Sequence, residues 1–220
     1  MIVVYKNFFR NRMVNLSKKS VQHFLPDAKF YAVSLFKHST DEYASQEPLD
    51  ADIVNCYRQT KWVLNNNRPL DTTVDSESAG YAYLGNARLF CEGLNFVYEE
   101  FKHTNEKVLM LAEDHFFTTG ETLRELTNNE FDWSYGTWTN STDVNGSILC
   151  FRPQALSYLL PIEEGMGTVE PYLEEKITLQ VDPSKRHRLT TRHHLDYHGD
   201  GFYTNSSEAM TTALKDAGII

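Results

Sequence analysis

The sequence predicts an α/β domain organised around a mostly parallel β-sheet. Residues 108–111 are four large apolar residues in succession, preceded by the polar residues 103–107. Such a run is typical of a strand buried on both faces. The N-terminus begins with a β-branched strand at residues 2–5, followed by a helical pattern and a second strand. This order is a β-α-β unit, which joins parallel strands.

Length and composition favour one globular domain over residues 1–220, either alone or as the N-terminal part of a longer chain. The chain has 220 residues, of which 41% are hydrophobic and 13% aromatic, enough for a sizeable core. Its formal net charge is −9 and no basic arm or Lys/Arg cluster lies along an element, which disfavours a nucleic-acid-binding protein.

The cysteines and the N-terminus indicate a soluble protein of the cytoplasm, or of the host cytoplasm if the chain is viral. Cys56, Cys91 and Cys150 are far apart, form no CxxC pair and provide no disulfide framework, as expected for a reducing compartment. The apolar run at residues 1–5 is too short for a signal peptide or a membrane span.

Apolar spacing and turn residues predict the elements before the central strand. Residues 13–25 have helical spacing and end at Pro26, and residues 29–36 read as the second strand. The loop at residues 6–12 carries Lys6, Arg10 and Arg12, which suit either an anionic ligand or plain solvation. Four further segments follow: a polar loop at 37–50, a helix at 53–64, an exposed connection at 71–78 and the longest helix at 81–101.

The segments after the central strand alternate between helices, strands and loops. They are a helix at 119–126, an aromatic loop at 131–138, a strand at 147–152, a short helix at 153–160, a helix at 171–179 and a polar loop at 192–201. Within the aromatic loop, Trp133, Tyr135 and Trp138 suit packing against the C–H surfaces of a sugar; aromatic side chains can equally anchor a loop to the core.

The central strand is followed directly by Glu113, Asp114 and His115. Open α/β sheets bind their ligands at the carboxyl ends of the strands. One or two carboxylates together with ligand phosphates are the usual ligands of Mg²⁺, and oxygen ligands also suit Mn²⁺. These residues therefore predict a divalent-metal site, and the alternative is a strand that ends in solvated charges.

Three groups of residues carry a family resemblance. They are Asn11-Arg12, Leu16, Ser20 and Phe24-Leu25-Pro26 before the strand at 30–35; Gly85-Asn86-Ala87-Arg88 and Glu92-Gly93-Leu94 before residues 108–115; and residues 165–170, Leu173-Glu174-Glu175 and Leu179. In this order they resemble the opening helix and second strand, the Asp-x-Asp metal motif and the later Glu-Asp segment of GT-A glycosyltransferases, which use nucleotide-sugars. More narrowly, the chain is similar to the N-terminal glycosyltransferase domain of a chlorella-virus protein that builds capsid glycans.

The resemblance implies a three-layer α/β/α domain of the GT-A fold, which is Rossmann-like and binds a nucleotide, with a mixed, mostly parallel sheet. It also implies transfer of a hexose or deoxyhexose, glucose- or rhamnose-like, from a UDP-sugar to a glycan or glycoprotein, with Mn²⁺ or Mg²⁺. The metal motif departs from the family because Glu-Asp-His stands in place of Asp-x-Asp. Asp114 is then the best metal ligand, with Glu113 and His115 behind it, and His198 or its rival His194 matches a C-terminal histidine ligand of retaining members.

The resemblance further implies a set of residues for binding the nucleotide-sugar and for catalysis. The expected cofactor-binding residues are Tyr5, Lys6, Arg12, Lys37, Arg88, Glu113 and Asp114. Tyr5 can stack on the base or belong to the core. Glu175 or Glu170 can act as the general base of an inverting reaction, and the sequence does not choose between inversion and retention.

Two other functions remain open from the sequence. His194 and His198 lie four residues apart with Asp196 and Asp200 interleaved, which suits a metal-dependent hydrolase, although Gly199 and Gly201 disfavour a helix there and no HExxH motif occurs. A non-catalytic, lectin-like sugar-binding module is the other alternative, and it would have no need of Asp114.

Overall fold

The computed structural model of the chain describes residues 1–7, 10–35, 47–58, 89–90, 92–137, 144–158, 181–189, 202–203 and 206–220. Its centre is a seven-stranded sheet with the strand order β3-β2-β1-β4-β7-β6-β8. The strands are β1 (Ile2–Asn7), β2 (Lys29–Leu35), β3 (Ile53–Arg58), β4 (Val108–Ala112), β6 (Trp133–Thr137), β7 (Val144–Phe151) and β8 (Arg186–Arg188).

The central sheet is mixed and mostly parallel, which confirms the predicted fold class. β1 pairs in parallel with both β2 and β4, and β2 with β3. β7 is antiparallel to β4 and to β6, whereas β6 and β8 are parallel. The opening β-α-β unit predicted from the sequence is confirmed by the parallel pairing of β1 and β2 across α1 (Asn11–Phe24).

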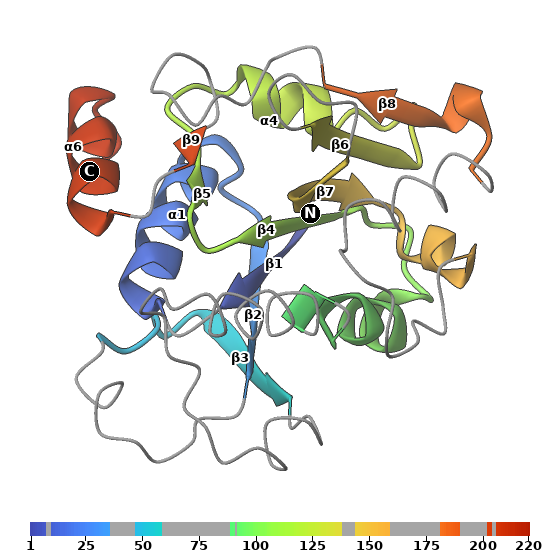
Figure 1. Cartoon of the computed structure of the whole chain (residues 1–220), viewed down its shortest axis with the longest axis horizontal. Coiled ribbons are helices and arrows are strands. Elements are labelled where there is room, and N and C mark those ends of the chain that lie inside the picture. The colour runs from blue at the N-terminus through green and yellow to red at the C-terminus, as the bar shows by residue number, and fades with distance from the viewer. Residues whose placement is uncertain are drawn as a thin grey trace, which may run out of the picture.

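Helices lie on both faces of the sheet and give three layers (Figure 1). Val108 and Met110 of β4 belong to one apolar cluster with Leu94 of the helix at residues 92–101. Leu109 and Leu111 belong to a second cluster, which contains Val14 and Val21 of α1 and Leu123 of α4 (Glu121–Leu126). Because β4 is apolar on both faces, it has the continuous apolar run of a doubly covered strand.

Burial of the central strands stabilises the fold. Val3, Val4 and Tyr5 of β1 and all five residues of β4 are buried. Removing one such apolar side chain from water contributes roughly 1.5–3 kcal/mol. The two clusters therefore fix the strands from both sides, and the carboxyl ends of β1 and β4 are held in a rigid frame.

A second, two-stranded sheet follows the central strand. β5 (His115–Phe116) pairs antiparallel with β9 (Phe202–Tyr203). The C-terminal helix α6 (Ser207–Asp216) lies outside α1 at the edge of the molecule (Figure 1). A third apolar cluster joins these parts: Met13, Leu16, Phe116, Met210 and Leu214.

The structure corrects three sequence predictions. Residues 53–58 form β3, so the predicted helix at 53–64 is wrong at its start. Residues 133–137 form β6, so the predicted aromatic loop is a strand there. β1 continues to Asn7, so Lys6 lies in a strand and the basic loop begins later than predicted.

Several predicted elements are confirmed, with small shifts. These are α1, β2, β4, β7, α4 and the short helix after β7, which is the 3₁₀ helix η2 (Pro153–Tyr158); a second 3₁₀ helix, η3 (Pro183–Lys185), precedes β8. The predicted helix at 81–101 is helical in its described residues. The predicted segments 71–78, 171–179 and 192–201 lie outside the described residues, as does most of 37–50.

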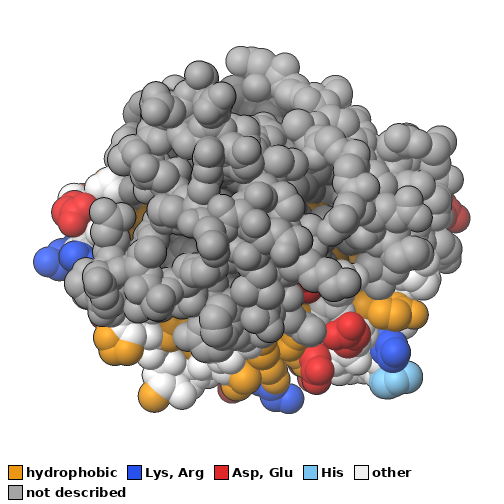
Figure 2. Space-filling model, turned by 60° about the horizontal axis from the view of Figure 1, so that its bottom comes forward, with side chains coloured by type: hydrophobic (Ala, Val, Ile, Leu, Met, Phe, Trp, Pro, Cys, Tyr) orange, Lys and Arg blue, Asp and Glu red, His pale blue; other side chains and the backbone are white. Residues whose placement is uncertain are grey.

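No helix in the described part of the chain has the length and apolar character that crossing a bilayer requires. On the face shown in Figure 2, described residues along the lower rim present acidic and basic side chains beside hydrophobic ones.

Candidate functional site

The site predicted from the sequence lies at the point where the order of strand addition in the sheet reverses. From β1 the chain moves to β2 and β3 on one side, and it then returns to β4 on the other side of β1. β1 and β4 are parallel with Lys6 opposite Ala112, so their carboxyl ends open at the same edge. In open α/β sheets this switch point is where ligands bind. Glu113 and Asp114 follow β4 there.

The two carboxylates are shielded from water and lie close enough to influence each other. Glu113 is 7% exposed and Asp114 8%. Burial raises the pKa of Glu113 to about 7, and the charge of Asp114 acts in the same direction. The charges of Arg10 and Lys6 lower the same pKa, and the Arg10 Nε atom lies 3.9 Å from the Glu113 Oε1 atom. The edge thus holds concentrated negative charge that nearby cations offset only in part.

This arrangement fits a divalent cation shared with a ligand. Carboxylate oxygens are hard donors that suit Mg²⁺ and Mn²⁺, and such ions commonly take one or two carboxylates and complete their shell with phosphate oxygens and water. Among the described residues, no group of three or more His, Cys, Asp or Glu side chains is placed to hold a metal ion. The carboxylate oxygens of Glu113 and Asp114 are donors of the type that such a cation takes.

His115 differs in position from the two carboxylates. The residue is 1% exposed, and its Nδ1 atom lies 2.9 Å from the Asp114 Oδ1 atom. Its backbone is held in β5, and its carbonyl oxygen accepts a hydrogen bond from the Ser17 hydroxyl of α1. The structure thus brings all three predicted motif residues together, with the imidazole on the inner side against Asp114.

Lys6 lies at the carboxyl end of β1 and is buried. It is 3% exposed, and its Nζ atom lies 4.9 Å from the centre of the Phe90 ring. Its charge is near enough to lower the pKa of Glu113. The predicted cofactor-binding lysine is therefore close to the carboxylates, although it projects from a strand and not from a loop.

Asn7 is a residue that the sequence analysis did not identify, and it links the end of β1 to the start of α1 and to β2. Its Nδ2 atom donates to the Asn11 Oδ1 atom at 2.8 Å and to the Ser34 Oγ atom at 3.1 Å, and its Oδ1 atom accepts from the Arg10 N–H at 3.0 Å. Short amide side chains commonly bond to the backbone of a following turn, and this is the signal that could have identified Asn7. Asn7 thus holds the backbone of Arg10, whose side chain lies beside Glu113.

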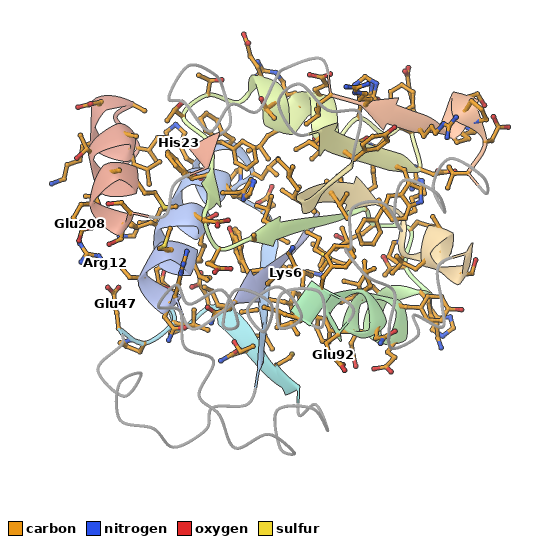
Figure 3. The ribbon with its side chains drawn as sticks, viewed as in Figure 1. Lys6, Arg12, His23, Glu47, Glu92 and Glu208 are labelled. Carbon is orange, nitrogen blue, oxygen red and sulfur yellow. The ribbon has the colours of Figure 1, made fainter. Side chains whose placement is uncertain are left out.

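Two predicted cofactor-binding residues, Arg12 and Tyr5, have other partners in the structure. The Nη1 atom of Arg12 is 3.8 Å from the Glu208 Oε1 atom of α6, and Figure 3 shows this pair at the outer edge of the molecule, away from Lys6. Tyr5 is fully buried, and its hydroxyl oxygen lies 3.4 Å from the Ser17 Oγ atom. Burial raises the pKa of the Tyr5 hydroxyl above its usual range. Tyr5 is therefore a core residue, the alternative that the sequence left open.

Two of the three aromatic residues predicted to contact a sugar, Trp133 and Tyr135, lie in the described part of the chain. Trp133 is fully buried and stacks on Phe151 with ring centres 4.8 Å apart, so it belongs to the core and its predicted contact with a sugar is wrong. Tyr135 is partly buried against the same apolar cluster. The remaining predicted residues lie outside the described residues: Lys37, Arg88, Trp138, Glu170, Glu175, His194 and His198.

No protein-family model and no curated protein matches the chain. Solved structures do. The inositol-1-phosphate CTP transferase from T. maritima has a TM-score of 0.53 at 11% identity, with 97% of this chain and 96% of that chain covered. A protein assigned as a glucose-1-phosphate thymidylyltransferase from Bacillus anthracis has a TM-score of 0.51 at 9% identity, with 100% and 95% covered.

A glycosyltransferase involved in the glycosylation of the major capsid of PBCV-1 has a TM-score of 0.45 at 13% identity, with 94% of this chain and 96% of that chain covered, and no conclusion rests on it. At these identities the similarities show the fold alone. The chain therefore shares its α/β fold, of the GT-A-like class, with these two structures.

Proposed function

We propose that this protein is a divalent-metal-dependent glycosyltransferase that moves a hexose or deoxyhexose from a UDP-sugar to a glycan or glycoprotein acceptor. The observation that supports this function is the pair Glu113 and Asp114 at the switch point of the sheet, beside the cations Lys6 and Arg10. An anionic, metal-binding group next to buried positive charge suits a diphosphate, because the diphosphate needs both a cation and further neutralisation.

The roles of the residues follow from the charges that develop in the reaction. When the sugar leaves the nucleoside diphosphate, negative charge grows on the phosphates, and bound Mn²⁺ or Mg²⁺ stabilises this charge. Asp114 and Glu113 hold the cation at the rigid end of β4. Lys6 and Arg10 place further positive charge at the same edge. Lys37 and Arg88 are proposed to contact the donor, His198 to bind the cation, and Glu170 or Glu175 to deprotonate the acceptor if the reaction inverts.

A nucleotidyltransferase is the second candidate. The two structures with the higher TM-scores carry names of such transferases. The sequence feature that disfavours it is the absence of glycine before Gly80, so the turn after β1 is not a glycine-rich loop. Such loops let backbone N–H groups approach phosphates closely.

The decisive experiment incubates the protein with UDP- and GDP-sugars and Mn²⁺ and measures nucleotide release. Wild-type protein is expected to release UDP, and Asp114→Ala should lower the rate by about 10²-fold or more, the loss typical of removing one electrostatic stabiliser of a transition state. Asp27→Ala is the matched control, because Asp27 is an exposed carboxylate in the turn before β2.

Other outcomes would contradict the proposal in distinguishable ways. Activity that EDTA and Asp114→Ala leave unchanged would exclude the metal role of Asp114. Release of pyrophosphate from a nucleoside triphosphate and a sugar phosphate would favour the nucleotidyltransferase. Hydrolysis of phosphoesters without a nucleotide-sugar would favour a hydrolase, and sugar binding without turnover of any donor would favour a lectin-like module.

A further inference from the structure

The contact between His115 and Asp114 has a defined direction. The two groups are 2.9 Å apart, from the imidazole Nδ1 atom to the Asp114 Oδ1 atom. An ionised carboxylate can only accept hydrogen bonds, so the Nδ1 atom carries the proton of this contact. Both side chains are buried, where a hydrogen bond to a charged group is stronger than in water.

The backbone at His115 and the residues after it are held at several points. His115 pairs with Tyr203 of β9, and its backbone carbonyl oxygen accepts a hydrogen bond from the Ser17 hydroxyl of α1. Two residues further on, the Phe117 N–H donates to the Ser20 hydroxyl at 3.0 Å. Phe116 packs in the apolar cluster that joins α1 and α6. His115 is therefore attached to packed helices, whereas Asp114 lies in the short turn between β4 and β5.

We infer that His115 is a positioning residue whose Nδ1–H fixes the orientation of the Asp114 carboxylate. This inference rests on the proposed function, in which Asp114 binds the cation. A carboxylate in a turn can rotate about its side-chain bonds, and the hydrogen bond from a buried ring on an anchored backbone selects one orientation. The imidazole thus acts through Asp114, whereas the family resemblance places it among the metal ligands.

Two substitutions separate these roles, because they reproduce different nitrogen atoms of the ring. His115→Asn places an amide N–H near the position of Nδ1 and retains a donor to Asp114. His115→Gln extends to the position of Nε2, where a metal ligand would be, and loses the Nδ1 donor. Because each replaces the ring with an amide, they are matched controls for lost ring volume.

The experiment measures Mn²⁺ binding in the presence of UDP from the electron paramagnetic resonance signal of free Mn²⁺, and the thermal unfolding of each variant. His115→Asn is expected to bind Mn²⁺ with nearly the wild-type affinity. His115→Gln should weaken it by roughly 10- to 100-fold, as is usual when the partner that orients a metal ligand is lost. UDP release should follow the same order, with the change in kcat at saturating Mn²⁺ smaller than the change in Mn²⁺ affinity.

The opposite order, with His115→Gln retaining affinity and His115→Asn losing it, would overturn the inference in favour of direct metal binding through Nε2. Equal affinity in both variants would also overturn it. If a variant does not fold, the nitrogen NMR signals of the wild-type ring decide, because an Nδ1 atom without a proton would contradict the inference. Failure of the proposed function would be distinguishable from these outcomes. The wild-type protein would then not bind Mn²⁺ in the presence of UDP and would not release UDP from any donor.

Discussion

Glu113 is a buried carboxylate whose charge is opposed by its surroundings. Burial has the largest effect on its pKa, the neighbouring Asp114 adds to it, and Arg10 at 3.9 Å and Lys6 offset only part of the increase. A group that is costly to ionise in the folded protein, yet lies where ligands bind, is a common feature of functional sites. A bound cation would lower this cost, since it adds the positive charge that the site lacks.

The metal-free protein should therefore lose stability as the pH rises. The folded-state pKa of Glu113 is about 7, above the ordinary value of 4.5. Between these pH values the folded state binds more protons than the unfolded state, so the free energy of unfolding falls with increasing pH, by roughly 3 kcal/mol in total for this group. Urea denaturation in EDTA, at about pH 5 and about pH 8, measures this change. The Glu113→Gln variant should show a smaller decrease, and an equal decrease in both proteins would contradict the assignment to Glu113.

Asn7 stabilises the turn that carries Arg10. Its side chain is 2% exposed and makes three hydrogen bonds, to Asn11, Ser34 and the Arg10 N–H. Asn7→Ala should lower the free energy of unfolding by about 1–3 kcal/mol, because buried partners lose their hydrogen bonds. Urea denaturation measures the loss, and Asn129→Ala at an exposed position is the control. A loss no larger than that of the control would contradict this role for Asn7.

At the scale of elements, α6 and β9 connect the C-terminus to the candidate site. β9 pairs with β5 directly after Asp114, and α6 packs on α1 through Met210 and Leu214. β5 contributes Phe116 to the same apolar cluster. Residues near the end of the chain therefore help to hold the turn at residues 113–114, although they are distant from it in sequence.

Leu214→Ala tests this connection. Leu214 is fully buried, and truncation of such a leucine leaves a cavity, so the free energy of unfolding should fall by about 2–5 kcal/mol. Lys215→Ala is the matched control, since Lys215 is the next residue of α6 and is exposed. Urea denaturation of both variants measures the difference, and equal stabilities would show that α6 contributes little to the fold.

The sequence predicted the buried central elements and failed where pairing is decided by distant strands. The apolar run of β4 was recognisable because both of its faces are covered. In β3, Ile53 is buried and Val54 is exposed, as expected for a strand with one covered face. β3 nevertheless forms only by pairing with β2, whose residues lie 23 positions earlier in the sequence than their partners in β3. β6 is a strand because it pairs with β7 on one side and with β8 on the other, and this pairing places its aromatic residues in or against the core.

At the scale of the whole molecule, topology brings together groups that the sequence could only suggest. Lys6 and Arg10 lie near residues 113–114 because β1 and β4 are parallel neighbours in the sheet. The sequence indicated the carboxylates from their position after an apolar run, and Lys6 from its charge. It could not show that Arg12 lies beside Glu208 and away from Lys6, because this placement depends on the direction in which α1 leaves the sheet and on the packing of α6.

If a cation and a diphosphate bind together at this edge, they should stabilise the whole molecule together. A ligand that binds only the folded state at 100 times its Kd adds about 2.7 kcal/mol to the free energy of unfolding. For a chain of this length the melting temperature should then rise by about 5–10 °C. Thermal unfolding with Mn²⁺ alone, UDP alone and both together measures the effect, and the joint shift should exceed the sum of the separate ones. Asp114→Ala should abolish the joint shift and Asp27→Ala should retain it. An equal shift with UDP in EDTA would show that the nucleotide binds without a cation.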